Sequence, residues 1–210
     1  SILTILRSAP NSARRPTARR SCERRKTELR GRPLSGPGMM STTHAAIGAA
    51  LATSLWAIAP SVAPVATVAA FLGGLAPDAD AVVGAHRRTL HHPELYPLLS
   101  AAAVLAAVVA PGPVTAATAA FLCSAALHSL ADVFGGGLAL RPWVADDDRG
   151  IYLHTRGRWV APLRWIRYDG APEDLVLAAA LTLPLALAAG PIRWLALAGL
   201  AVSVPYVVFR

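Results

Sequence analysis

Six apolar segments limit the folds open to this chain more than any other feature. They cover residues 44–59, 62–76, 95–110, 114–131, 174–189 and 191–208, and each is rich in Ala, Leu and Val and nearly free of charge. The breaks between segments fall at Pro60, at the PGP of residues 111–113 and at the GP of residues 190–191. Because Pro and Gly end helices, the pattern predicts an all-α fold of about six helices in three hairpins.

The composition favours a membrane protein. Hydrophobic residues make up 54% of the chain and the mean hydropathy is +0.46, which is high for a soluble protein. Pro184 and Pro205 lie inside the last two segments, where a membrane helix accommodates them more easily than a soluble one. Several segments are shorter than the ~20 residues of a full span, so a thinned bilayer, helices of little tilt and a buried soluble bundle stay open. We expect an integral-membrane helical bundle.

The connection between the fourth and fifth segments, residues 135–172, is longer and more polar than the others. Its stretch GIYLHTRGRWV alternates like a short β-hairpin around Gly157. The aromatic residues interleaved with arginines in this connection are Trp143, Tyr152, Trp159, Trp165 and Tyr168. Such a mixture is typical of a belt at the lipid headgroups, which we favour over a dedicated binding surface. A small, hairpin-like polar insertion is therefore predicted.

Residues 1–38 carry the net charge of the whole chain. Ten Arg or Lys and two Glu give this segment +8, whereas residues 39–210 hold ten basic and ten acidic groups. With few apolar residues to bury, the segment is predicted to be a disordered basic tail. We expect the working protein to begin at Met39 or Met40, the alternatives being an arm for nucleic acid or anionic lipid and a twin-arginine export signal. The neutral body, residues 39–210, is expected to be one domain that binds no nucleic acid.

Threading the helices up and down would bring the polar motifs to one face. The start of the first, third and fifth segments and the end of the second and fourth then share a side of the bundle. The motifs at those places are His44, Asp78 with Asp80, the histidines of residues 86–92, and His128 with Asp132. The same side holds nine of the ten arginines of the body, with Arg193 opposite. The positive-inside rule therefore predicts a multi-pass protein of the plasma membrane with this face in the cytoplasm.

The gathered side chains have the chemistry of a metal site. His128 and Asp132 are four residues apart and share one face of a helix, and alternate residues of an extended loop can point Asp78 and Asp80 the same way. Each residue alone is more often structural, but five of the six histidines of the body meet at one face. Imidazole and carboxylate ligands suit zinc, the most favoured ion, and also manganese or iron. The candidate ligands are His44, Asp78, Asp80, His91, His92, His128 and Asp132, with His86 as an alternative within its block.

Four stretches, in order, resemble a known family. MMSTTHAAIGAALA, LGGLAPDAD, HRRTLHH and ALHSLADVFGGG are similar to successive blocks of the membrane-bound, predicted metal-dependent hydrolases typified by the LexA-regulated inner-membrane proteins of bacteria. The resemblance covers residues 40–140 and implies a distant similarity to zinc-dependent phospholipase C and single-strand nucleases. The site residues that it implies are His44, Asp78, Asp80, one histidine of residues 86–92, His128 and Asp132.

The third block departs from the family pattern. Where the family reads His-Arg and then Thr-His-Ser, Leu90 separates Thr89 from His91, and His92 stands where the serine is expected. The sequence therefore leaves open which of His91 and His92 is the ligand.

Together these features predict a membrane-bound metal-dependent hydrolase of a phosphoester that is either free or carried by a lipid. A metal-bound water would be the nucleophile, with Asp80 and Arg87 as catalytic residues. Arg87 and Arg88 are suited to binding the phosphate, and anchoring to lipid headgroups is an equally open role for them. The alternative is a non-enzymatic transporter or metal-handling protein, but a transporter needs polar groups at mid-membrane, where the segments offer mainly Ser, Thr and small residues.

Overall fold

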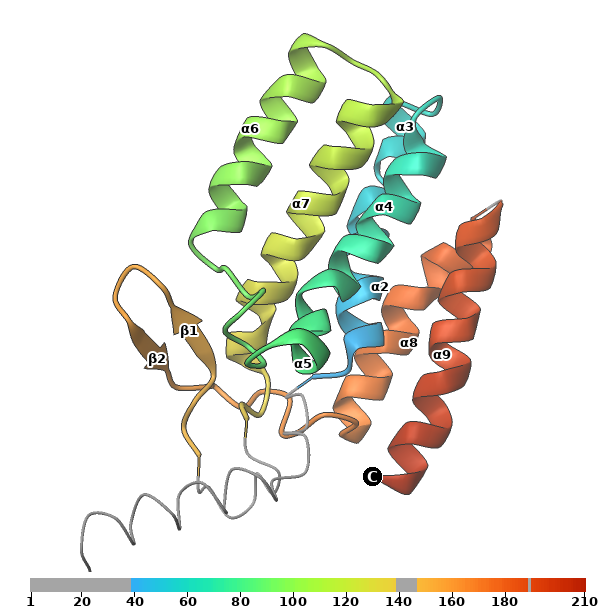
Figure 1. Ribbon diagram of the computed structural model, residues 1–210. Helices are drawn as coiled ribbons and strands as arrows, with labels where there is room; N and C mark the ends of the chain where they lie inside the picture. The colour runs from blue at the N-terminus through green and yellow to red at the C-terminus, as the bar shows by residue number, and fades with distance from the viewer. Residues whose placement is uncertain (1–38, 139–146, 189) are drawn as a thin grey trace, which may run out of the picture. The chain divides into compact units, whose positions relative to one another are not determined.

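A computed structural model describes residues 39–138, 147–188 and 190–210, and the predicted tail lies outside the described residues. The described chain is mostly helical, as predicted (Figure 1). Its helices are α2 (Ser41–Ala52), α3 (Leu55–Ile58), α4 (Ala63–Leu75), the 3-10 turn η1 (Ala76–Ala79), α5 (Asp80–Val83), α6 (Leu95–Val109), α7 (Pro113–Ala131), the 3-10 turn η2 (Asp132–Phe134), α8 (Pro172–Leu187) and α9 (Pro191–Phe209). Two short strands, β1 (Ile151–Leu153) and β2 (Arg158–Val160), precede α8.

Three helical stretches are long and apolar enough to cross a membrane, which supports the predicted membrane protein. They are Ala63–Val83, Pro113–Phe134 and Pro191–Phe209. Helix α6 is apolar as well but has 15 residues, fewer than the ~20 that a full span needs. By length and composition these three stretches suggest a membrane protein, but they do not show a bundle of six full spans.

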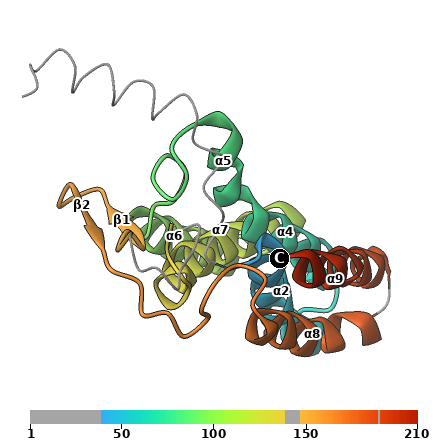
Figure 2. The ribbon, with the colours of Figure 1, turned by 90° about the horizontal axis from the view of Figure 1, so that it is seen from below.

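The helices are threaded up and down, so that the predicted polar motifs meet at one end. Helix α2 packs against α4, α7 and α8, while α6 packs against α7 and α9 against α8. Seen from below, α2 and α4 lie between the α6–α7 pair and the α8–α9 pair (Figure 2). The start of α2, the end of α4, the end of α7 and the start of α8 all lie at the lower end in Figure 1. This lower end is where the candidate site is found.

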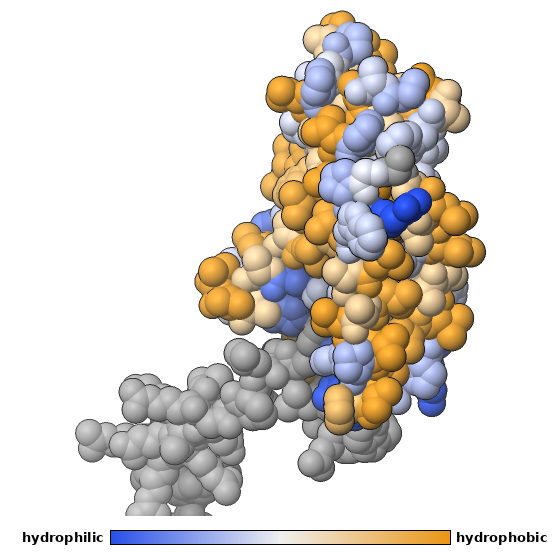
Figure 3. All heavy atoms as spheres, turned by 90° about the vertical axis from the view of Figure 1, so that its right-hand side faces the viewer, coloured by the Kyte–Doolittle hydropathy of each residue, from blue (hydrophilic) through white to orange (hydrophobic). Residues whose placement is uncertain are grey.

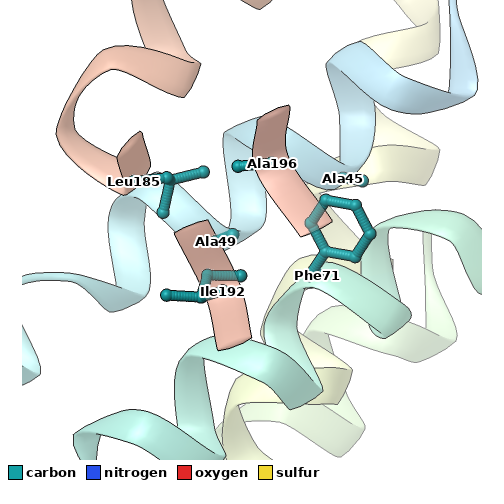
Figure 4. Close-up of a cluster of buried hydrophobic side chains, with 6 residues drawn as sticks. All are labelled: Ala45, Ala49, Phe71, Leu185, Ile192 and Ala196. Atoms are coloured by element: carbon teal, nitrogen blue, oxygen red, sulfur yellow. The ribbon is translucent and has the colours of Figure 1, made fainter. Parts of the chain in front are cut away.

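Small residues let the central helices approach closely. One buried cluster joins α2, α4, α8 and α9 and is half alanine (Figure 4): Ala45, Ala49, Phe71, Leu185, Ile192 and Ala196. On α4, a Cβ at Gly73 would lie 2.2 Å from the carbonyl oxygen of Phe121, and a Cβ at Gly74 would lie 2.6 Å from that of His44. Close approach through small residues is the usual way in which membrane helices associate. Gly74 therefore fixes how near α4 comes to the start of α2.

The outer surface of the helices is apolar. Many large hydrophobic side chains of α6 and α9 are exposed, among them Leu98, Leu105 and Val108 on α6 and Val202, Val208 and Phe209 on α9. Figure 3 shows apolar residues over much of the face that α9 forms. Soluble monomers rarely expose apolar patches of this extent, so the surface is suited to lipid.

The predicted hairpin is confirmed. Strands β1 and β2 pair antiparallel, with Tyr152 opposite Trp159, and Gly157 in the turn has a φ of +58°, which glycine adopts without strain. Beyond β2 the chain returns to the end of α7, where the amide of Leu163 donates to the carbonyl of Val133 (2.7 Å). The hairpin is thereby tied to the end of the bundle that carries the polar motifs. Trp143 of the predicted aromatic belt lies outside the described residues.

Candidate metal centre

Five of the predicted ligands converge at the lower end of the bundle. They come from five separate places: the first turn of α2, η1, the loop between α5 and α6, the last turn of α7, and the start of η2. Their side chains form two groups that share His128, and within each group the ligand atoms lie within 4.8 Å of one another: His44, His128 and Asp132, and Asp78, His91 and His128. These five residues could hold a metal ion, and we call them the metal centre.

The spacing of the inner atoms matches that of ligands around one small cation. The Nε2 atoms of His91 and His128 are 3.1 Å apart, and Nε2 of His91 is 3.1 Å from Oδ2 of Asp132. Oδ1 of Asp78 is 3.3 Å from Nε2 of His128. Bonds of about 2.0–2.1 Å to a tetrahedral zinc would separate neighbouring ligand atoms by roughly 3.3 Å. Nε2 of His91 is 3.6 Å from Oδ1 of Asp78, and Nε2 of His128 is 3.9 Å from Oδ2 of Asp132, so the donor spacings lie close to those that such an ion requires.

The two central histidines are held through their outer nitrogens. Nδ1 of His128 donates to the carbonyl oxygen of Gly74 (2.6 Å), and Nδ1 of His91 donates to Oδ2 of Asp80 (2.9 Å). In a neutral ring the proton is then on Nδ1, and the lone pair of Nε2 faces the centre. Metal-binding histidines are commonly oriented by a carbonyl or carboxylate in this way.

His44 adds a buried imidazole that the described chain leaves partly unpaired. Its ring stacks on that of His128, with centroids 3.8 Å apart, and its Nε2 is 3.2 Å from Oδ1 of Asp132. Nδ1 of this buried ring has no hydrogen-bond partner within the described chain, and the carboxylate of Asp132 is the group beside Nε2. A buried polar atom without a partner is costly, and a cation bound by His44 and Asp132 would compensate that cost. The residues present thus fit a metal ion.

The field around His91 favours a cation. Burial by itself lowers the pKa of this imidazole, but hydrogen bonds with Asp132, Asp78 and Asp80 outweigh burial and raise its pKa to about 11. Three carboxylates around one ring make a strongly negative pocket. A divalent ion in that pocket would take the place of the proton.

Asp80 does not belong to the metal centre but is hydrogen-bonded to one of its histidines, His91. It is fully buried, Oδ1 accepts from Nδ1 of His86 (2.9 Å), and Oδ2 accepts from His91 and from the amide of Leu90 (3.1 Å). Both oxygens are thus engaged in fixing the loop, and neither belongs to the two ligand groups. Asp80 positions His91 and His86, whereas the sequence suggested a ligand and catalytic group.

Of the two adjacent histidines, the structure brings His91 into the centre and leaves His92 outside. His92 stacks on His154, with ring centroids 4.3 Å apart, and its Nε2 donates to the carbonyl of Thr89 (3.1 Å). It belongs to neither ligand group. Of these two histidines, the loop therefore places only His91 within reach of the other candidate ligands.

The two arginines of the block also take different places. Arg87 is buried, and its guanidinium donates to Oδ1 of Asp132 (2.6 Å) and to the carbonyl of Gly150 (3.2 Å). Its backbone is left-handed, with a φ of +61°, so the side chain turns inward. Arg88 is exposed and lies over the ring of Tyr152, 4.6 Å from its centroid. Arg88 can reach a ligand, whereas Arg87 holds a metal-centre carboxylate.

Other residues support the centre without having been predicted to do so. The hydroxyl of Ser41 donates to Oδ2 of Asp78, and buried Asp174 accepts from the amide of Met40 (2.7 Å) and the hydroxyl of Thr43 (2.6 Å). Ser41 lies three residues before His44, and that helical spacing is a signal the sequence offered. The carbonyl of Gly74 offered none, because every residue has one.

Comparison with family models, with curated proteins and with solved structures finds no match for this chain. The similarity to membrane-bound metal-dependent hydrolases therefore rests on the four sequence blocks, and the centre is interpreted from its own geometry.

Proposed function

We propose that this protein is an integral-membrane, metal-dependent hydrolase that cleaves a phosphoester at the membrane surface. The observation that carries the proposal is the buried pair of imidazoles, His91 and His128, whose Nε2 atoms face each other 3.1 Å apart beside Asp78 and Asp132. Imidazole and carboxylate donors are the ligands of catalytic zinc sites, which take three protein ligands and keep one position open, and each of the two ligand groups has three. The resemblance in residues 40–140 points to the same class of enzyme.

The buried residues and the accessible Asp78 have different roles in the proposed reaction, metal binding and proton transfer. A divalent ion, with zinc favoured by the donor set, supplies Lewis acidity and a bound water of lowered pKa. His44, His91, His128 and Asp132 are buried and serve to hold it. The side chain of Asp78 is 14% exposed against 2% for Asp132, so Asp78 is the carboxylate that can exchange a proton with substrate or solvent. We therefore assign it the role of proton acceptor in place of buried Asp80.

We assign substrate binding to the exposed arginine near the centre, Arg88. Arg88 is accessible and held on Tyr152 of the hairpin, whereas Arg87 is committed to Asp132. A guanidinium matches the oxygens of a phosphate and forms two hydrogen bonds with it. Arg88 is thus the proposed phosphate-binding residue, with the hairpin as its support.

A transporter or metal-handling role is less well supported. Among the described residues, the buried ionisable side chains gather at the lower end of the bundle: His44, Asp80, Arg87, His91, His128, Asp132, Asp169 and Asp174. A path across the membrane would need such groups further along the helices. There, the buried hydroxyl of Thr67 is satisfied by its own helix, through the carbonyl of Ala63 (2.7 Å).

The proposal places the protein in the plasma membrane as a multi-pass chain with the centre facing the cytoplasm. The exposed arginines at the lower end, among them Arg88, Arg156 and Arg158, support this orientation, while Arg193 lies at the other end of α9. Excess Arg and Lys mark cytoplasmic loops.

Metal analysis of the purified full chain tests the proposal. Wild-type protein in detergent is expected to retain zinc and to cleave a chromogenic phosphodiester. His128→Ala is expected to lose both and Asp78→Ala to lose the hydrolysis, whereas His92→Ala, a histidine outside the ligand groups, keeps its metal. Equal metal content in all four proteins would contradict the metal centre. Retained metal without hydrolysis of any phosphoester would contradict the enzyme.

A further inference from the structure

An apolar cavity of about 760 Å³ lies between α2, α3, α4, α6 and α7, toward the end of the bundle away from the metal centre. This volume is within the range of small-molecule sites, roughly 300–1,000 Å³. No charged side chain is among the described residues that line it. Representative lining residues are Leu55, Ile58, Val104, Val108, Ala120 and Leu127.

The inner end of the cavity lies one helical turn from the metal centre. Gly48 on α2 and Ser124 on α7 both line the cavity, and each is four residues from a metal-centre histidine, His44 and His128. On α4, Ala70 lines it four residues before Gly74, whose carbonyl holds His128. Four residues advance a helix by about 6 Å. Along three helices, the inner end of the cavity thus lies about one turn from the centre.

The outer side of the cavity is continuous with the lipid-facing surface. Ile58 and Val108 line the cavity and are 77% and 73% exposed. Two of the enclosing helices, α4 and α7, belong to the stretches long and apolar enough to cross a membrane. In a bilayer, hydrocarbon chains of lipids cover the apolar exterior of these helices. Such a chain can therefore enter the cavity from the side.

We propose that this space, the acyl cavity, holds one fatty-acyl chain of a membrane lipid whose phosphoester head is presented at the metal centre. The inference rests on the proposed function and narrows its substrate to a phospholipid. An acyl chain matches an uncharged lining, and its head would emerge where Arg88 and Asp78 are accessible. Ser124, buried with no hydrogen-bond partner in the described chain, marks the inner limit of the cavity.

Photolabelling tests the acyl cavity separately from catalysis. Full-length protein is placed in phosphatidylcholine nanodiscs that contain phosphatidic acid with a diazirine in the middle of one acyl chain, and crosslinked peptides are mapped by mass spectrometry. We expect preferential labelling of the lining of α6 and α7 over the outer face of α9. Ala120→Trp, which fills the cavity, is expected to abolish that preference, and Val202→Trp on α9 is the matched control because Val202 faces outward.

The outcomes separate this inference from the enzyme proposal. Even labelling of α6, α7 and α9 in the wild type, or a preference that survives in Ala120→Trp, would overturn the acyl cavity. Cys123→Phe provides a second filled variant, and wild-type metal content in either filled variant shows that it has folded. Preferential labelling that persists in His128→Ala supports the acyl cavity even where the metal centre has been destroyed.

Discussion

His91 and His128 meet Nε2 to Nε2 at 3.1 Å, while their outer nitrogens are fixed by Asp80 and by the carbonyl of Gly74. Each ring is thus held through its outer nitrogen, and its Nε2 faces that of the other ring. The orientation of both rings therefore depends on Asp80 and Gly74, which lie outside the set of candidate ligands.

Replacing Asp80 by Asn should weaken metal binding without abolishing it. The amide cannot offer two negative oxygens to His86 and His91, so His91 becomes less basic and less well oriented. Losses of about 10- to 100-fold in affinity are typical for such partners. Competition with a chelator measures the change, and Asp148→Asn, at an exposed surface ion pair, is the control. Unchanged affinity in Asp80→Asn would argue against the positioning role.

Replacing Arg87 by Met should destabilise the fold. The guanidinium is buried against Asp132, and its removal takes away the permanent positive charge that compensates this interior carboxylate. Breaking a buried ion pair in this way costs about 3–5 kcal/mol. Unfolding in detergent micelles gives the loss, and adding zinc should recover part of it by compensating Asp132. The neighbouring exposed Arg88→Met is the comparison and should change the free energy of unfolding by less than about 1 kcal/mol.

Gly74→Ala should disturb both packing and metal content. The new methyl group would lie 2.6 Å from the Cα of Ala45 and from the carbonyl oxygen of His44, which forces α4 away from α2. Since the carbonyl of Gly74 also accepts a hydrogen bond from Nδ1 of His128, the displacement would also move His128, a candidate ligand. Gly199→Ala is the control, because a Cβ there meets nothing closer than 3.8 Å. Equal thermal stability and metal content of the two variants would contradict the packing argument.

The stability of the protein should depend on the ionisation of Asp169. Burial raises the pKa of this carboxyl to about 6, with Asp174 adding to the effect and the hydrogen bond from Tyr206 opposing it. The folded state therefore holds the proton more tightly than the unfolded chain. Stability from this group is greatest below about pH 4 and falls by on the order of 3 kcal/mol as pH rises to about 6.

Asp169→Asn should remove this dependence, since the amide carries no charge to bury and still accepts from Tyr206. Unfolding in micelles between pH 4 and pH 7 measures it. The variant is expected to gain on the wild type as pH rises, and a difference that is constant with pH would count against the assignment.

The orientation can be read by labelling single cysteines. In a chain with Cys22 and Cys123 replaced by Ser, Arg156→Cys in the hairpin should react with an impermeant maleimide in inside-out vesicles but not in intact cells. Arg193→Cys, at the other end of α9, should show the reverse. The opposite pattern would place the metal centre outside the cytoplasm.

The sequence predicted the helices well because Pro and Gly mark their ends. It missed the division of the first segment into α2 and α3, where neither residue occurs. There the hydroxyls of Thr53 and Ser54 bond to the carbonyls of Ala50 and Leu51, three residues back. Side chains that compete for backbone carbonyls interrupt a helix without any breaker residue.

The sequence predicted which residues gather but not the role of each. Asp78 and Asp80 were expected to point the same way from an extended loop, yet η1 and α5 make this stretch helical. Residues two apart on a helix point roughly 200° apart, so Asp78 faces the centre and Asp80 faces the following loop. Likewise, the left-handed backbone of Arg87 could not be foreseen, because only Gly and Asn commonly signal it.

The single guanidinium of Arg87 joins the loop before α6 to Asp132, 45 residues later, and to Gly150, 63 residues later. The ribosome synthesises Arg87, Asp132 and Gly150 in that order, so Gly150 emerges after α7 has been completed. The nascent chain therefore completes the hydrogen bonds of Arg87 only after the polar insertion has emerged, so that the side chain that holds Asp132 is fully fixed at a late stage of synthesis.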